Sequence, residues 1–145
     1  IEYMNARFPG IAYAPVAFVS ARKGENVWEA FELARHLHEQ SGTKVSTHQL
    51  NEVLQAAQNE RTPPSPGGRL PRVFYGTQAG THPPRFIVFV NYPEAFTEDY
   101  RRYLIGKIRK NLPFPEVPVV LWLRGRTRAS EKSRRAHAVE GEDEA

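Results

Sequence analysis

Residues 72–91 read RVFYGTQAGTHPPRFIVFVN and contain two apolar runs of strand length, 72–79 and 85–91. The five residues between them, 80–84, are enough for a hairpin but too few for the crossover that joins parallel strands. We therefore expect these strands to be antiparallel neighbours. A third apolar and β-branched run, 117–123, predicts the last strand of the same sheet.

A helix is predicted on each side of this hairpin. Ser46 and Gln49 have the S-x-x-Q spacing of a capping box, which predicts a helix that begins at Ser46 and ends before the Pro- and Gly-rich run 61–68. Thr97 predicts the start of another helix, with acidic residues in its first turn and basic residues in its last. The resulting order of helix, strand, strand, helix and strand predicts an α+β sandwich whose helices cover one face of a three-stranded sheet.

The first forty residues have a different pattern. The apolar run 14–21 predicts a buried strand, and Asn26 is expected to cap a helix over about 27–40. A buried strand that leads into a helix is half of an α/β crossover unit, and its neighbouring strand is missing from this sequence. We therefore expect the chain, which begins at Ile1, to be a piece of a longer protein, with residues 41–45 as a linker.

Composition excludes several classes of protein. The 145 residues include no cysteine, which removes disulfide frameworks, cysteine nucleophiles and zinc–thiolate sites. No apolar run approaches the ~18 residues that span a bilayer, so we expect a cytoplasmic protein that does not bind a membrane. Residues 127–145 are charged, small and aperiodic, and they are predicted to form a disordered tail.

Basic residues are concentrated in the middle of the chain. Residues 69–129 hold eleven Lys and Arg against four Asp and Glu, whereas residues 1–68 hold six against seven. Fifteen of the twenty basic residues are arginine, whose planar guanidinium suits phosphate contact and stacking on bases. Charge alone leaves two interpretations open, a polyanionic partner and a plain solvated surface.

Five stretches of the sequence occur in the order and spacing of one known family. They are Tyr13–Ala21 with Gly24; Val45–Thr47 with Leu50 and Asn51; Pro63 and Pro64 with Gly67 and Gly68; Tyr75–Pro84 with Phe86 and Phe89–Asn91; and Tyr100–Leu104. Through them the chain resembles the C-terminal end of the Der (EngA) family of bacterial GTPases. These proteins have two tandem G domains followed by a KH-like domain and act in assembly of the large ribosomal subunit.

The resemblance implies two parts. Residues 1–40 would be the last strand, loop and helix of the second G domain, a P-loop α/β domain, with Ser20, Ala21 and Arg22 contacting the guanine base. Residues 46–126 would be the KH-like domain, with the order α-β-β-α-β. No G-x-x-x-x-G-K-[ST] loop occurs in the chain, so we expect it to hold no cofactor and to hydrolyse no nucleotide itself. GTP and Mg²⁺ would belong to the parent protein.

The resemblance also implies partners: rRNA and the large ribosomal subunit, and the G domains of the same polypeptide, with the protein a monomer. The G-x-x-G loop by which KH domains clamp a nucleic-acid backbone is missing between Asn91 and Thr97. Basic side chains near the strand ends and on the second helix are then the candidates for RNA or ribosome contact: Arg69, Arg72, Arg85, Arg101, Arg102, Arg109, Lys110, Arg124 and Arg126. Arg102 and Arg109 are seven residues apart, so we expect them to share the outer side of that helix.

Other chemistry-bearing residues have simpler interpretations. His36 and His38 are two apart on one helix, which is unsuitable for a metal pair. His82 is interpreted as a hairpin-loop residue, with phosphate contact as the alternative. Five aromatic residues are predicted to lie in the core, with base stacking as the alternative: Trp28, Phe74, Phe86, Phe89 and Trp122.

Three functions are left open by the sequence. The first is a ribosome-contacting module of an assembly GTPase. The second is an intramolecular domain that reports nucleotide state on a G domain and never touches RNA. The third is hydrolysis of nucleotide by this chain itself. RNA binding that weakens with salt would favour the first, and absence of turnover would exclude the third.

Overall fold

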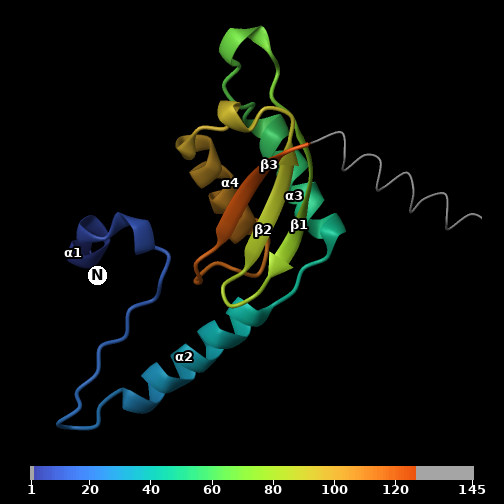
Figure 1. The fold of residues 1–145 in the computed structure, drawn as a ribbon. Coiled ribbons are helices and arrows are strands. Elements are labelled where there is room, and N and C mark those ends of the chain that lie inside the picture. Colours follow the sequence, from blue (N-terminus) through green and yellow to red (C-terminus); the bar gives the residue numbers. More distant parts are fainter. Residues whose placement is uncertain (1, 127–145) are drawn as a thin grey trace, which may run out of the picture.

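The computed structural model describes residues 2–126, so the predicted tail at 127–145 lies outside the described residues (Figure 1). The helices are α1 (Glu2–Arg7), α2 (Val27–Gly42), α3 (Thr47–Glu60) and α4 (Glu98–Asn111), and the strands are β1 (Val73–Gly80), β2 (Arg85–Val90) and β3 (Val120–Gly125). Short 3₁₀ turns occupy Pro9–Ile11, Pro66–Gly68 and Pro93–Ala95.

The three strands form one mixed sheet with β2 in the centre. β1 pairs antiparallel with β2, from Val73 opposite Val90 to Gly80 opposite Arg85, which confirms the predicted hairpin. β3 pairs parallel with the other edge of β2. Figure 1 shows α3 and α4 on one face of this sheet. The predicted α+β, KH-like order α-β-β-α-β is therefore confirmed from residue 46 onward.

The core lies between the sheet and the two helices that cover it. Each element contributes side chains from one face only, because residues at i and i+2 of a strand, and at i and i+4 of a helix, point the same way. The fully buried side chains include Leu50 and Leu54 of α3; Tyr100, Leu104 and Ile108 of α4; and Phe86, Val88, Val90 and Leu121 of the sheet. Each such side chain contributes about 1.5–3 kcal/mol by leaving water.

Side-chain caps fix where both covering helices begin. The Ser46 hydroxyl accepts the backbone N–H of Gln49 at 3.2 Å, and the Gln49 side chain accepts the N–H of Ser46 at 3.1 Å, which confirms the capping box. The Thr97 hydroxyl accepts the N–H of Tyr100 at 3.3 Å. These bonds satisfy N–H groups that have no partner within their own helix.

The strand predicted at 14–21 does not form. This segment is extended but has no ladder of hydrogen bonds, and the pairing recorded there is a single bridge between Ser20 and Glu25. A strand needs a neighbour to satisfy its backbone, and none runs beside this segment in the described part of the chain. Asn26 also does not cap α2 with its side chain, whose Nδ2 donates instead to the Phe18 carbonyl at 3.0 Å.

The helix predicted over 27–40 does form, but it continues two residues into the predicted linker and ends at Gly42. None of its residues is buried. Val27, Trp28 and Phe31 near its start are 48–68% exposed.

The prediction of five core aromatic residues is largely wrong. Phe86 is fully buried, whereas Trp28 is 68% exposed and Trp122 is 42% exposed. Phe74 and Phe89 are half-buried. The reason is that the helices cover only one face of the sheet, so alternate residues of each strand project from the other face. Trp28 lies at the start of α2, none of whose residues is buried, and Leu37 in the second half of that helix packs against the core.

Candidate nucleic-acid interface

The sheet face opposite α3 and α4 carries no helix among residues 2–126 (Figure 1). We call it the open face. The strand register defines it, because directly paired residues project to the same side. Its members are Tyr75, Thr77 and Gly80 of β1; Arg85, Ile87 and Phe89 of β2; and Val120, Trp122 and Arg124 of β3.

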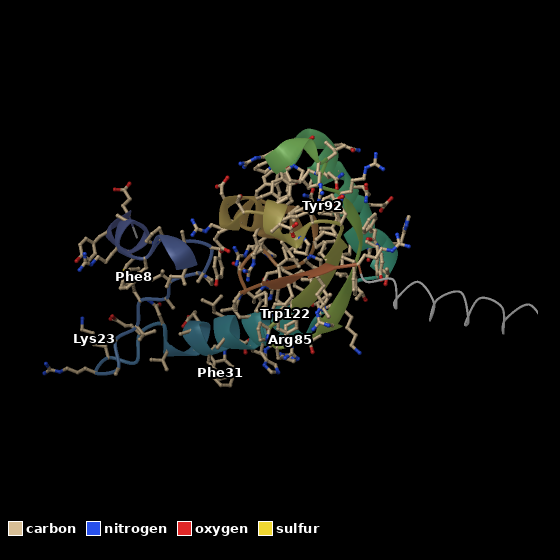
Figure 2. The ribbon with its side chains drawn as sticks, turned by 45° about the horizontal axis from the view of Figure 1, so that its top comes forward. Phe8, Lys23, Phe31, Arg85, Tyr92 and Trp122 are labelled. Carbon is tan, nitrogen blue, oxygen red and sulfur yellow. The ribbon has the colours of Figure 1, made fainter. Side chains whose placement is uncertain are left out.

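Arg85 and Arg124 are the two predicted contact residues on this face, and they lie at opposite ends of it. Both are exposed. Arg126 follows Arg124 by two residues; its N–H donates to the Val90 carbonyl at 3.0 Å, and its guanidinium lies 4.9 Å from the centre of the Phe74 ring. Figure 2 shows Arg85 close to Trp122, in agreement with the register.

Two more of the predicted arginines lie near Arg124 and Arg126. Because β1 runs opposite to β2 and β3, the start of β1 meets the ends of the other two strands, and Arg72 therefore comes to this end of the sheet. Asn91 ties Arg72 in place, since its side-chain oxygen accepts the Arg72 N–H at 2.7 Å. The Arg69 guanidinium lies 5.5 Å from the centre of the Tyr92 ring. We call this group, Arg69, Arg72, Arg124 and Arg126, the basic end.

Four basic residues on the helical side of the domain are paired with carboxylates. Arg61 contacts Asp99 at 2.6 Å, and Lys107 contacts Glu60. Glu98 contacts two of the predicted residues, Arg101 at 3.4 Å and Arg102 at 3.9 Å. Such exposed pairs add little stability, about 0–1 kcal/mol each, but they neutralise this side.

Acidic residues are therefore segregated from the open face. Residues 44–126 contain twelve basic and six acidic residues. The acidic ones lie on α3 and α4, in the turn before α4 and in the loop before β3: Glu52, Glu60, Glu94, Glu98, Asp99 and Glu116. No carboxylate belongs to the open face, so its arginines present positive charge that the sheet itself does not balance.

Arg109 does not share an exposed side with Arg102, and that expectation is wrong. Its guanidinium lies 3.6 Å from the centre of the Tyr13 ring, and its Nε–H donates to the Val117 carbonyl at 3.3 Å. Burial lowers the pKa of Arg109, and the nearby Tyr13 partly opposes this. Lys110 is exposed and borders a hollow that also contains Glu52 and Glu60, where the charge is mixed.

The predicted guanine-contact loop, Ser20–Arg22, is far from the arginines of the open face and the basic end. Ser20 closes a turn, because its carbonyl accepts the Gly24 N–H at 2.7 Å and its N–H donates to the Glu25 carbonyl at 3.0 Å. Ala21 and Arg22 are exposed in that turn. Figure 2 shows Lys23, in the same turn, at the opposite end of α2 from Arg85 and Trp122. The structure therefore brings the two sets of predicted residues to separate places.

Two histidines of α2 contact loops of the domain, His38 the hairpin loop and His36 the loop before β3. His82 lies in the hairpin loop, its ring stacks on that of His38 with centres 4.5 Å apart, and its N–H donates to the Ser41 carbonyl at 3.1 Å. His36 Nε2 lies 3.5 Å from a carboxylate oxygen of Glu116. Within residues 2–126 no group of three or more His, Asp or Glu side chains is arranged to hold a metal ion.

Sequence reasoning assigned Phe89 and Trp122 to the core with base stacking as the alternative, and it did not single out Tyr75. Tyr75 stacks on Phe89 across the β1–β2 pair, with ring centres 4.6 Å apart, and Trp122 lies beside Ile87. Five consecutive residues of β2, 86–90, are apolar, so its sequence does not show which face the helices cover. No helix in the described part of the chain is both long enough and apolar enough to cross a bilayer.

Comparison with known proteins gives one family. The family model described as KH-domain-like of EngA bacterial GTPase enzymes, C-terminal, matches residues 44–124. The chain is 40% identical over 136 residues to GTPase Der of Rhodopirellula baltica, which is 94% of this chain and 30% of that protein. It is 33% identical over 128 residues to GTPase Der of Protochlamydia amoebophila, covering 88% of this chain and 26% of that protein. GTPase Der of a Synechococcus species is 43% identical over 124 residues, which cover 85% and 27% of the two chains. The chain thus spans less than a third of the length of these curated relatives.

Proposed function

The chain belongs to the KH-domain-like family found at the C-terminus of EngA bacterial GTPases, and from this premise we propose that residues 46–126 are the ribosome-contacting module of a tandem-domain GTPase. The module would contact rRNA during biogenesis of the large ribosomal subunit, in the cytoplasm, and would also pack on the G domains of its own polypeptide.

The observation that carries this proposal is the segregation of charge. Ion pairs occupy the helical side, whereas the open face presents Arg85 and Arg124 and has no carboxylate among its members. Arg69, Arg72 and Arg126 of the basic end add positive charge next to it, with Glu94 bordering the same hollow as Arg69. A polyanion such as RNA is attracted to a surface of one sign, and phosphate groups match the guanidinium fork. The absent G-x-x-G loop requires that contact be made elsewhere in the domain, and the sheet side offers it.

For the N-terminal part we propose the end of the second G domain. Similarity to the GTPase Der proteins continues beyond the KH-like family region and includes 94% of the chain in one case. In the parent protein, Ser20, Ala21 and Arg22 would approach the guanine base of GTP. The phosphate loop and the Mg²⁺ ligands would come from parts of the polypeptide not in this sequence, so this chain would supply no catalytic residue.

A second candidate function is an intramolecular regulatory domain that reports nucleotide state without binding RNA. It is favoured by the contacts that tie α2 to the KH-like domain. The Gln40 side chain accepts the Glu116 N–H at 2.9 Å and donates to the Glu116 carboxylate at 3.2 Å. Together with the His82 contact to Ser41, these bonds would transmit a shift of the G-domain helix to the sheet.

The two candidates are separated by measuring binding of the chain to a transcribed fragment of large-subunit rRNA at several salt concentrations. We expect log K to fall linearly with log salt, with a slope near 0.7 per phosphate neutralised. The double variant Arg85→Glu, Arg124→Glu should lose most of the affinity. Its matched control is Arg101→Glu, Arg102→Glu, which reverses the same charge on the helical side and should bind nearly as well as wild type.

A larger loss of RNA affinity in the variant Arg101→Glu, Arg102→Glu would indicate that RNA contacts α4. That result would contradict the assignment of the contact to the sheet. Absence of binding by the wild-type chain at low salt would leave only the regulatory function.

A further inference from the structure

We propose that the open face is a stacking platform for single-stranded RNA, on which Trp122 and the Tyr75–Phe89 pair receive unpaired bases while Arg85 and Arg124 receive the backbone phosphates. The proposal rests on the proposed function, because it names the form of RNA that the same surface would take.

The aromatic side chains on this face are placed for such contact. Trp122 lies in the middle of β3 and is 42% exposed, although it is the largest side chain in the sheet. Trp122 is paired with Ile87, so it is a diagonal neighbour of Phe89 on the adjacent strand. The Phe89 ring stacks on Tyr75 with 22° between the ring planes. Exposed aromatic side chains on a sheet are stable stacking partners for bases, because every base has a π face.

Arginines border the aromatic residues on both sides. Arg124 is paired with Phe89, so a base on that ring would bring its phosphate toward the guanidinium. At the other end Arg85 folds across Gly80, where an added Cβ atom would lie 2.5 Å from its guanidinium nitrogen. Beyond it lies a hollow of about 470 Å³ bordered by Lys44 and Arg85, which continues the positive path off the sheet.

The charge on this face argues for RNA rather than for a second copy of the chain. Two open faces in contact would bring Arg85 and Arg124 of each copy against arginines of the other, with no carboxylate on either face to pair with them. Like charges placed together in an interface oppose association by several kcal/mol. A phosphodiester strand supplies an anion for Arg85 and Arg124 and a π face for Trp122.

The exposure of the Trp122 ring argues for a single strand rather than a duplex. The bases of an RNA duplex are paired and stacked on one another, so their faces cannot reach Trp122 or Phe89. Unpaired bases can be splayed out onto a sheet surface, and stacking is worth about 1–3 kcal/mol per base.

Tryptophan fluorescence tests the proposal directly. Trp28 and Trp122 are the two tryptophans of the chain, and Trp28→Phe leaves Trp122 as the only reporter. We expect oligo(A) of about twelve nucleotides to quench Trp122 and shift its emission in a saturable manner, and a self-complementary RNA duplex of similar length to leave it unchanged at the same nucleotide concentration.

Affinity measurements with a matched pair of variants provide the second test. Trp122→Leu keeps an apolar side chain but removes the stacking surface, and we expect it to weaken oligo(A) binding by roughly fivefold or more, as for the loss of one stacked base. Trp28→Leu makes the same replacement on α2, away from the sheet, and should bind like wild type. Unfolding curves of both variants establish that each is folded.

Three outcomes would overturn the stacking proposal. Equal binding of duplex and single strand, or wild-type affinity in Trp122→Leu, would make the contact purely electrostatic. In that case loss of rRNA binding in Arg85→Glu, Arg124→Glu would still leave the proposed function standing. Dimerisation on sedimentation that Trp122→Leu abolishes, without any quenching by oligo(A), would assign the face to a second copy.

Discussion

Gly76 is the residue at which α3 comes closest to the sheet. A Cβ atom there would lie 2.6 Å from Leu54 Cδ1 and 3.2 Å from Leu50 Cδ2, and both leucines are fully buried. Asn51 fixes the same contact, because its side chain accepts the Gly76 N–H at 2.7 Å and donates to the Gly76 carbonyl at 3.3 Å. The absence of a side chain at this position therefore sets the distance between α3 and β1.

Replacing Gly76 by alanine should destabilise the domain by about 1–3 kcal/mol, because the packed leucines have little room to move. The free energy of unfolding in urea measures this. Gly106→Ala on α4 is the matched control: nothing lies within 4 Å of its added Cβ, and the better helix propensity should stabilise the protein by up to about 1 kcal/mol. Equal effects at the two positions would contradict the close approach of α3.

Tyr100 gives the domain a dependence on alkaline pH. It is fully buried, and its hydroxyl donates to the Arg61 carbonyl at 2.7 Å. Burial raises the pKa of Tyr100 from 10.0 to about 12, with a further contribution from Tyr103 and opposition from Arg61. The unfolded chain ionises this phenol near pH 10, while the folded chain keeps it protonated, so the stability it contributes is complete below about pH 10 and is lost between about pH 10 and 12.

The variant Tyr100→Phe tests this linkage. Near pH 8 we expect it to be less stable than wild type by about 1 kcal/mol, because the hydrogen bond from the Tyr100 hydroxyl to the Arg61 carbonyl is lost. Near pH 11 the difference should shrink or reverse, since only the wild type then favours the unfolded state by ionising the phenol. A difference in unfolding free energy that stays constant from pH 8 to 11 would show that Tyr100 does not carry the raised pKa.

The two helices that cover the sheet begin at side-chain caps, and long-range contacts hold the elements together. The capping box at Ser46 starts α3 directly after α2 ends at Gly42, and the Gln78 side chain accepts the Val45 N–H at 2.8 Å. The short connection between the two helices is thus held to β1 rather than left free.

Removing the cap should therefore affect α3 as a unit. Ser46→Ala loses the acceptor for the Gln49 N–H and should lower the unfolding free energy by about 1 kcal/mol. Thr47→Ala, at the next and exposed position, is the control and should change it by less than about 0.5 kcal/mol. If amide hydrogens of residues 47–50 exchange faster in Ser46→Ala but not in Thr47→Ala, the loss of stability is located at the start of α3. Equal exchange in both variants would contradict a role of the Ser46 cap in holding this turn.

The Arg109 contact joins α4 to the N-terminal segment. Arg109→Glu would replace the cation that lies over Tyr13 by a partly buried anion and should lower the unfolding free energy by about 1–2 kcal/mol. Arg102→Glu, exposed on the same helix, should change it by less than about 0.5 kcal/mol. Thermal unfolding of the two variants checks this, and equal melting temperatures would mean that Tyr13 and Arg109 are not in stable contact.

At the scale of the whole molecule, the two sides of the domain carry different kinds of side chain. The helical side is covered by ion pairs and the sheet side by arginines and aromatic rings. Fold stability and RNA binding should therefore respond differently to salt, because exposed ion pairs contribute little whereas phosphate contacts release counterions.

We expect an increase from about 0.05 to 0.2 M salt to change the melting temperature only slightly, while the affinity for rRNA falls by at least tenfold. Calorimetry and a binding titration on the same sample check this. A parallel decline of both quantities would mean that the arginines of the sheet side contribute to the fold rather than to a partner.

Local rules were sufficient for much of this domain. The length of the 80–84 loop predicted the β1–β2 hairpin, and the spacing of Ser46 and Gln49 and the acidic turn after Thr97 predicted where α3 and α4 begin. Each of these features depends on residues within a few positions of one another. The bonds of this turn and these caps form between neighbouring residues, and for that reason sequence alone determined them. The predicted Asn26 cap failed because its side chain donates to the Phe18 carbonyl instead.

Contacts between distant segments decided the remainder. The sequence left open which edge of the hairpin β3 would join and which face the helices would cover, and the parallel pairing of β3 with β2 sets Arg124 beside Phe89 and Trp122 beside Ile87. The unpaired segment at 14–21 and the Arg109 contact with Tyr13 likewise depend on neighbours far away in the chain. Burial and strand pairing are properties of the assembled layers, so only the tertiary structure could place rings and arginines on one exposed face.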